Sequence, residues 1–293
     1  MSTTVERAEL VTAAAFPASA DVQAIIRLAL AEDVGRGDVT TEATVSPDAV
    51  ARADILQKAP GVVCGLPVVA KVWRELDPRV HVTPVVAEGS FDDRRRVVAR
   101  LDGPASAILT GERTALNFLQ RLSGVASVSR RAMQLVVGSH ATVIDTRKTT
   151  PGMRVLEKYA VRVGGASNHR AGLDDGMLIK ENHIRAAGGI SPAVRAAQRR
   201  AAPGMLVEVE VTSLDELDEA LAAGATLILL DNFSIDTLRA AVTHTRGRAR
   251  LEASGGIHLD NLAAVAATGV DFISLGALTH SAGVLDFSLE VIS

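Results

Sequence analysis

The stretch "LVEVEVTSLDELDEALAAGATLILLDN" (residues 206–232) decides the fold, because it contains one complete strand–helix–strand unit. Two strand-like runs flank a segment whose leucines recur at helical spacing, and Ser213 with Glu216 forms a capping box at the start of that segment. Strands that are joined through a helix pair in parallel, and the helices then cover the sheet. This unit therefore predicts a parallel sheet covered by helices.

The same pattern extends over the chain from residue 141 onwards. Further strands are predicted in "TVID", "MLIK", "RLEAS" and "FISLG", and a weaker one near residues 161–169. Six clear strands and one weak strand favour an α/β barrel or near-barrel over a short open sheet. A doubly wound sheet is the alternative, but the GxGxxG dinucleotide fingerprint is absent from the sequence.

The N-terminal part has a different pattern, in which short strands mix with helices. Strands are predicted in "ARADILQK", "VHVTPVVAEG" and "RRVVARLDG", with a helix after Asp21, another near residues 67–76, and two helices over 105–138 broken near Ser123 and Gly124. We therefore predict a disordered N-terminus (1–20), an N-terminal α/β domain of the α+β sandwich type (21–125, with 283–293 packing back on it) and an α/β barrel (126–282).

Composition excludes several classes of function. A net charge of −3 and an aromatic content of 3% argue against a nucleic-acid surface. No run of about 18 apolar residues exists, so no membrane span is expected. The first 20 residues make a poor signal peptide, and the single cysteine, Cys64, cannot form an internal disulfide. These features predict a cytoplasmic location.

Cations follow the first predicted strands of the barrel. Residues 141–185 hold eight Lys or Arg and five Asp or Glu, in a chain whose net charge is negative. Because chemistry in such barrels lies at the carboxyl ends of the strands, we expect Arg147, Lys148, His169, Arg170 and Lys180 to converge there. An anion with two carboxylates or several phosphates would neutralise them. Solvated loop charges are the alternative.

The remaining strand exits are acidic and then glycine-rich. Glu210 and Asp231 predict a Mg²⁺ site shared with substrate phosphates, with ordinary salt bridges as the alternative. Whether Glu208 also faces inward stays open. "ASGGI" and "LGALT" end the last two strands, at the position where barrels hold phosphate on backbone N–H groups.

These residues also resemble a known family. "GERTALNFLQRLSGVAS", "DTRKTTPGMRVLEKYAVRVGGASNHRAGLDDGMLIKENHI", "EASGGI" and "GVDFISLGALTHS" are similar to the nicotinate-nucleotide pyrophosphorylase, or quinolinate phosphoribosyltransferase, family. The resemblance implies conversion of quinolinate and phosphoribosyl pyrophosphate to nicotinate mononucleotide, pyrophosphate and CO₂ in NAD synthesis. It also implies an incomplete seven-stranded α/β barrel and a homodimer with shared sites, and it leaves any higher oligomer open.

The resemblance further implies a role for each matching residue. Catalytic roles fall to Arg147, Lys148, Lys180, Glu210 and Asp231, of which the last two would bind Mg²⁺. Substrate binding falls to a larger set, in which the partner subunit donates the first member: Arg113, Thr146, Arg147, Lys148, His169, Arg170, Lys180, Ser254, Gly255, Gly256, Gly276, Ala277 and Leu278.

Three other functions remain open at this point. A Schiff-base lyase on the same barrel would use Lys180 as its amine. A non-catalytic sensor of anionic metabolites would not need Glu210 and Asp231 in a cationic pocket. A related transferase could act on another pyridine or pyrrole acid.

Overall fold

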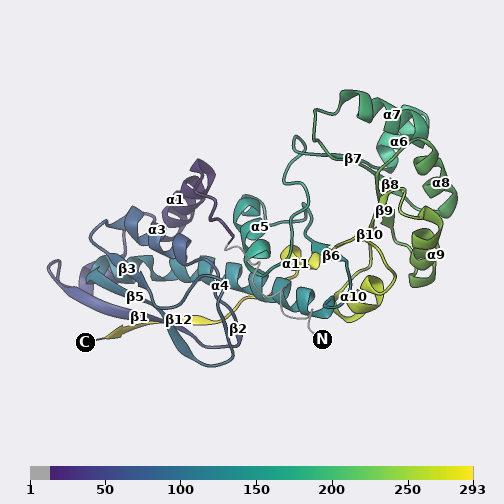
Figure 1. The fold of residues 1–293 in the computed structure, drawn as a ribbon. Helices are drawn as coiled ribbons and strands as arrows, with labels where there is room; N and C mark the ends of the chain where they lie inside the picture. The colour runs from purple at the N-terminus through teal and green to yellow at the C-terminus, as the bar shows by residue number, and fades with distance from the viewer. Residues whose placement is uncertain (1–13, 293) are drawn as a thin grey trace. The chain divides into compact units, whose positions relative to one another are not determined.

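The computed structural model describes residues 14–292, which form two compact units (Figure 1). The first unit contains the described residues up to Arg130, together with Thr149–Gly165 and the segment from Thr279 onwards. The second contains Arg131–Lys148 and Ala166–Leu278. These limits differ from the division predicted at 125/126, and residues 149–165 lie in the first unit although we expected them in the barrel.

The first unit is built on a four-stranded antiparallel sheet with the order β12-β1-β5-β3. Its strands are β1 (Val50–Gln57), β3 (His81–Pro84), β5 (Arg96–Pro104) and β12 (Phe287–Ile292), and a separate pair is formed by β2 (Gly61–Val62) and β4 (Phe91–Asp92). The predicted strands of this region are confirmed. Pairing of β12 with β1 brings the end of the chain into this sheet.

Helices of the first unit are α1 (Ala20–Val34), α2 (Val39–Thr44), α3 (Leu66–Leu76), α4 (Ala105–Leu135, which runs on into the second unit) and α5 (Arg154–Val163). The predicted helix near 67–76 is confirmed as α3, and its fully buried Trp73 donates Nε1–H to the carbonyl of Ile108 at 3.2 Å. Helix α1 begins at Ala20, slightly before the start predicted after Asp21, and Ser19 caps it by accepting a hydrogen bond from the N–H of Val22. The predicted disorder falls mostly on residues 1–13, outside the described residues.

Helix α4 corrects one prediction, because it is a single helix where we expected a break near Ser123 and Gly124. Both residues serve packing instead. The Ser123 hydroxyl accepts from the N–H of Cys64 at 2.9 Å and donates to its carbonyl at 3.1 Å. A Cβ on Gly124 would lie 1.9 Å from the carbonyl oxygen of Gly283, so only glycine permits this approach. Small residues here mark a close contact and not a helix end.

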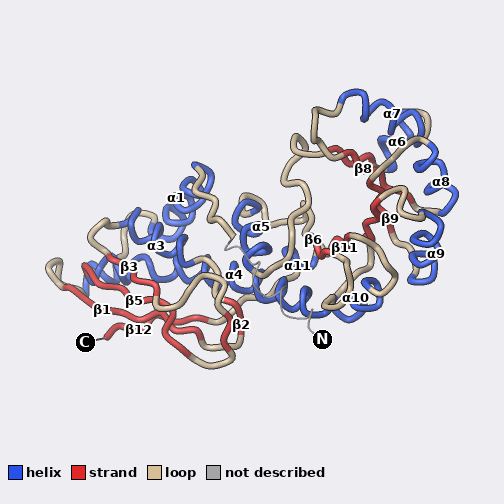
Figure 2. Tube along the Cα trace, in the orientation of Figure 1, coloured by secondary structure: helices blue, strands red, loops and turns tan. Residues whose placement is uncertain are grey.

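The second unit is an incomplete α/β barrel (Figure 2). Six parallel strands follow the order β6-β11-β10-β9-β8-β7: β6 (Thr142–Ile144), β7 (Met177–Ile179), β8 (Val207–Val211), β9 (Leu227–Asp231), β10 (Arg250–Ser254) and β11 (Phe272–Ser274). From β7 to β11 each strand lies beside the next in sequence, and β11 then pairs with β6. A doubly wound sheet would reverse its order at the middle, so that alternative is wrong.

The weak seventh strand is reduced to one bridge, in which Ser167 pairs in parallel with Ile144. The outer side of the sheet is covered by α6 (Glu181–Ala187), α7 (Ile190–Arg200), α8 (Leu214–Ala222), α9 (Ile235–Thr245) and α10 (Leu259–Ala266) (Figure 2). Ser213 and Ser234 cap α8 and α9 by accepting from the N–H groups of Glu216 and Thr237. The Glu216 carboxylate accepts from the N–H of Thr212 instead of Ser213, so only half of the predicted capping box forms. A short helix, α11 (Ala277–His280), follows β11 directly.

Candidate active site

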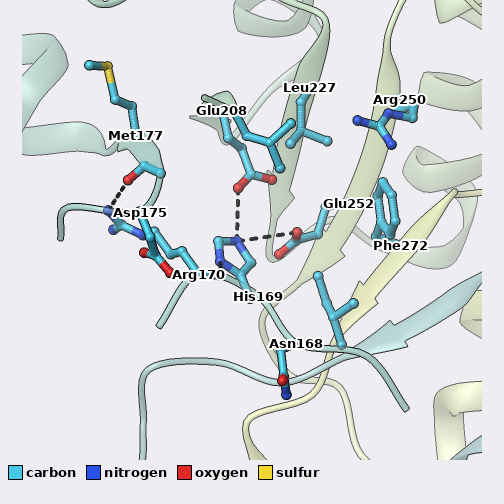
Figure 3. A pocket seen from close by; sticks show the side chains of 13 residues that line it. Asn168, His169, Arg170, Asp175, Met177, Glu208, Leu227, Arg250, Glu252 and Phe272 are labelled. Carbon is cyan, nitrogen blue, oxygen red and sulfur yellow. Dashed lines mark hydrogen bonds and ion pairs between the residues drawn. The ribbon is translucent and has the colours of Figure 1, made fainter. Parts of the chain in front are cut away.

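Side chains at alternate strand positions face the interior of the barrel. Glu208, Leu227, Arg250, Glu252 and Phe272 line one cavity of about 140 Å³ there (Figure 3). Because strand side chains alternate between faces, Glu210, Asp231 and Ser254 share this inward face, two or more positions nearer the carboxyl ends. Glu208 and Glu210 therefore both point inward, which settles the question left open by the sequence.

His169 lies at the centre of the cavity wall, between two buried glutamates (Figure 3). Its Nε2 is 3.0 Å from Oε2 of Glu208 and 3.6 Å from Oε2 of Glu252, while its Nδ1 accepts a hydrogen bond from the N–H of Arg170 at 2.7 Å. Burial, and then the charge of Glu208, raise the pKa of Glu252 well above its ordinary value. Two carboxylates and one imidazole thus form a buried polar cluster.

Asp145 brings the two cationic motifs together. This fully buried residue follows β6, and its carboxylate accepts from the N–H of His169 at 2.8 Å and from Nδ2 of Asn168 at 2.6 Å. Burial, and then the positive charge of Arg147, lower the pKa of Arg170. Arg147 and Arg170, which are 23 positions apart in the sequence, therefore lie close enough to repel one another.

A second group of charges lies at the exits of β7, β8 and β9. Nζ of Lys180 is 2.8 Å from Oε2 of Glu210. The pKa of Asp231 is raised, first by burial and then by the charge of Glu210, while a hydrogen bond from Asn232 and the charges of Lys180 and Lys148 act in the opposite direction. Lys148, predicted for the pyrophosphate, and Glu210 and Asp231, predicted for Mg²⁺, thus lie in one cluster. Lys180, predicted for the quinolinate carboxylates, lies in the same cluster.

The glycine-rich exit of β10 contains strained backbone that glycine permits. Gly255 has φ +88°, and a Cβ there would lie 2.2 Å from Oδ1 of Asn232. Gly256 has φ +63°, with no other heavy atom within 4 Å of an added Cβ. The open space and the turned backbone suit the approach of a phosphate to N–H groups.

The exit of β11 holds the last three predicted binding residues, Gly276, Ala277 and Leu278. Leu278 is fully buried and its N–H donates to the carbonyl of Leu275 at 3.2 Å. Thr146, at the exit of β6, accepts from the N–H of Lys148 at 3.0 Å. Arg113 is exposed on α4, in the first unit.

One trio in the described part of the chain has a spacing that could hold a metal ion, namely His169, Glu208 and Glu252, whose ligand atoms lie within 4.8 Å of one another. Positive charges stand next to it, because Arg170 is near Glu208 and Lys180 is near Glu252. We therefore assign the trio as a hydrogen-bonded cluster. Glu210 and Asp231 fit Mg²⁺ better, since this ion takes only one or two protein carboxylates alongside substrate phosphates.

Sequence reasoning missed Glu252, Asp145 and Asn168. Each stands inside a motif already singled out, and Glu252 shares the strand parity of Ser254. An acid in the middle of an otherwise apolar or small-residue strand was the available signal, because an unpaired buried charge is costly.

Comparison with known proteins identifies the family. The model of the quinolinate phosphoribosyl transferase C-terminal domain matches residues 125–290, and that of the N-terminal domain matches residues 38–123. This chain belongs to the quinolinate phosphoribosyl transferase family. None of the helices within residues 14–292 is long and apolar enough to cross a membrane.

Relatives of this family match nearly the whole chain. A probable nicotinate-nucleotide pyrophosphorylase (carboxylating) of Bacillus subtilis is 44% identical over 89% of this chain and 90% of its own length. The Mycobacterium leprae nicotinate-nucleotide pyrophosphorylase is 44% identical over 91% and 95%. The solved structure of the nicotinate-nucleotide pyrophosphorylase from Francisella tularensis has a TM-score of 0.88 at 42% identity, covering 93% of this chain and 96% of that one.

Proposed function

We propose that this family member is a quinolinate phosphoribosyltransferase, a decarboxylating pentosyltransferase of NAD biosynthesis. It converts quinolinate and phosphoribosyl pyrophosphate to nicotinate mononucleotide, pyrophosphate and CO₂. The observation that carries the proposal is that burial, and then the charge of Arg147, lower the pKa of Arg170, so that two guanidinium groups lie near one another in the barrel unit. A dicarboxylate relieves that repulsion, and guanidinium groups pair bidentately with carboxylates.

Charge separates the two ends of the substrate site. The carboxylates of quinolinate are bound by Arg147, His169, Arg170 and Lys180, with Arg113 donated by the partner subunit. This binding holds the ring nitrogen in line with the anomeric carbon. Lys148 stabilises the negative charge that develops on the departing pyrophosphate. No protein nucleophile is needed, since positioning and electrostatic stabilisation suffice for such a transfer. After transfer, the positive ring nitrogen stabilises the carbanion that loss of CO₂ leaves on the adjacent carbon.

Mg²⁺ is part of the proposal, with Glu210 and Asp231 as its protein ligands. When bound, it would neutralise charge on the pyrophosphate. The raised pKa of Asp231 beside Glu210 supports this, because two neighbouring carboxylates invite a cation. Asp231→Asn should raise the Mg²⁺ concentration needed for half-maximal activity and leave quinolinate affinity nearly unchanged. Collapse of quinolinate affinity with a normal Mg²⁺ response would reverse the assignment of the two ends.

Homodimers with shared sites and a cytoplasmic location complete the proposal. Family resemblance and the exposure of Arg113 on α4 support its donation to the site of the partner subunit. Arg113→Ala and Arg170→Ala should each be nearly inactive. Co-expressed at equal levels, they should recover about a quarter of wild-type activity, because one site of each mixed dimer bears neither defect. Mixed dimers without recovery would refute the shared site.

The decisive assay supplies phosphoribosyl pyrophosphate and Mg²⁺ with either quinolinate or nicotinate and follows mononucleotide formation. Quinolinate should be turned over, and nicotinate should be a poor substrate because it leaves one carboxylate position empty. Comparable turnover of nicotinate would contradict the assignment of quinolinate as the substrate. Borohydride with a keto acid should give no adduct at Lys180, and a stable adduct would instead support the lyase.

A further inference from the structure

The cavity of about 140 Å³ in the barrel has one side at the substrate site and the other at the opposite end of the barrel (Figure 3). All of its lining residues belong to the second unit. One side is formed by His169 and Arg170, to which the proposed function assigns the carboxylates of quinolinate. The other side lies at the starts of the strands, where Leu206 is 56% exposed and Arg250 is exposed as well. The cavity therefore reaches solvent at the end of the barrel that is opposite to the strand exits.

The lining of this cavity is mainly apolar, and two of its acids are incompletely hydrogen-bonded. Apolar side chains come from Ile144, Met177, Leu206, Leu227 and Phe272. Glu208 is 3% exposed and Glu252 is 2% exposed, and within residues 14–292 neither Oε1 atom has a hydrogen-bond partner. Buried polar atoms without partners need an explanation in a native structure. A small molecule that passes these atoms provides one.

The proposed reaction produces such a molecule while the strand exits are occupied. The bond between the carboxyl carbon and the ring carbon beside the nitrogen breaks, and its electron pair stays on the ring carbon, which then takes a proton from water. CO₂ leaves as a neutral, triatomic molecule. At that moment the mononucleotide still fills the strand exits near Glu210 and Asp231. The route by which the substrates entered is therefore closed to CO₂.

We propose that this cavity is the exit path of CO₂, which passes the two glutamates and leaves the barrel between Leu206 and Arg250. The inference rests on the proposed function, because it assigns the cavity to one product of that reaction. The carbon of CO₂ is electron-poor and suits the carboxylate oxygens, while its oxygens are electron-rich and suit the Arg250 guanidinium. This guanidinium lies 5.1 Å from the ring centre of Phe272, which holds it at the solvent end of the cavity (Figure 3).

Size and charge exclude the other reactants from this path. A water molecule takes about 30 Å³ in the liquid, so a cavity of about 140 Å³ has room for CO₂ but not for a mononucleotide. Burial, and then the charge of Glu208, raise the pKa of Glu252 well above its ordinary value, so the pair carries less charge than two separate carboxylates. Pyrophosphate would lose its hydration on this apolar lining, which is costly for an ion. The path therefore selects the small neutral product.

Single-turnover reactions with quinolinate and phosphoribosyl pyrophosphate provide the first test. Leu206→Trp narrows the solvent end of the cavity from a partly exposed position, so CO₂ that cannot leave should rejoin the ring carbon. Quenched samples should then contain about fivefold more quinolinate mononucleotide than wild type, while pyrophosphate forms at a rate within about twofold of wild type. Leu214→Trp makes the same change at an exposed leucine of α8, outside the cavity, and should behave as wild type.

Each other result of this test has one meaning. Pyrophosphate that forms normally in Leu206→Trp without extra quinolinate mononucleotide would overturn the exit path, and so would a release of quinolinate mononucleotide by wild type before it loses CO₂. Phe272→Trp narrows the same end from β11 and gives the reading if Leu206→Trp does not fold. Wild type that forms no pyrophosphate with quinolinate would instead refute the proposed function.

Crystals of the full chain under CO₂ pressure provide a second test, which needs neither substrate. Density for a linear molecule should appear in the cavity beside Glu208 and Glu252, and it should be weaker in Leu206→Trp crystals pressurised for the same short time. A cavity that holds no CO₂ in wild type, or one that fills equally in both proteins, would overturn the path.

Discussion

Each unit of this protein buries carboxylates, and the two units treat them differently. In the first unit Glu157 is fully buried and accepts from Nε and Nη2 of Arg121 at 3.0 and 2.7 Å, and from the N–H and hydroxyl of Thr150 at 3.0 and 2.8 Å. In the barrel, Glu208 and Glu252 share one imidazole and each keeps an oxygen without a partner among residues 14–292.

The difference separates an architectural carboxylate from a functional one. Because its oxygens are fully hydrogen-bonded, Glu157 connects residues 149–165 to Arg121 of α4. In the barrel, the carboxylates are incompletely hydrogen-bonded, and buried polar atoms without partners are typical of functional sites. A buried acid should therefore be judged by its unsatisfied atoms as well as by its burial.

The largest expected effect comes from removing the charge of Glu157. Glu157→Gln leaves Arg121 without its counter-charge, and loss of one partner from a buried pair costs about 3–5 kcal/mol of unfolding free energy. Urea denaturation should detect it. Asp236→Asn, which breaks the exposed pair with Arg239, is the control and should stay within about 0.5 kcal/mol. Equal small effects would remove the distinction between the two kinds of carboxylate.

Arg147→Lys sharpens the comparison from the barrel side. Lysine keeps the charge but loses the bidentate fork. The transition-state stabilisation calculated from kcat/KM for quinolinate should therefore weaken by about 1–3 kcal/mol. Unfolding free energy should hardly change, in contrast to Glu157→Gln. Arg185→Lys, on the exposed face of α6, should leave kinetics at the wild-type level. Normal kinetics in Arg147→Lys would mean that residues 146–148 form an ordinary surface loop.

Two adjacent glycines provide a matched pair at the predicted phosphate end. Gly255→Ala combines a positive φ with a Cβ placed 2.2 Å from Oδ1 of Asn232, and it should lower the free energy of unfolding by about 2 kcal/mol. Gly256→Ala meets only the φ penalty, about 1 kcal/mol. Thermal unfolding should rank them in this order, and KM for phosphoribosyl pyrophosphate should rise more in Gly255→Ala. The reverse ranking would show that the turn relaxes.

The smallest effect concerns Glu88 in the first unit. Burial raises its pKa, against hydrogen bonds from the N–H groups of Gly65 and Leu66 and from the hydroxyl of Tyr159. A carboxyl whose pKa is raised on folding stabilises the fold most below its unfolded pKa, and this contribution is lost as pH rises through the folded pKa. The Tm of wild type should therefore decline relative to Glu88→Gln as pH rises from about 4.5. A constant difference would contradict the raised pKa.

Much of the barrel and its site could be predicted from the sequence. Continuous strands, capping serines and polar exits are local signals, and "LVEVEV" and "LILLD" became β8 and β9 with Glu210 and Asp231 on the inward face. Helix α4 could not be predicted as one piece, because Ser123 and Gly124 resemble a break unless the contacts with Cys64 and Gly283 are known. The membership of residues 149–165 depends in the same way on the pairing of Glu157 with Arg121.

What the sequence determined by itself was therefore the order of elements, the family, and the residues at each strand exit, because periodicity and motif spacing act over short distances along the chain. Only the tertiary structure decided that His169 turns its Nε2 to Glu208 and Glu252 and its Nδ1 to Arg170. The physical reason is that strand register and barrel closure, and not sequence distance, bring β8, β10 and the 168–170 segment to one point. Burial in the folded barrel then raises the pKa of Glu252, since desolvation acts on a carboxyl group only after its neighbours have excluded water.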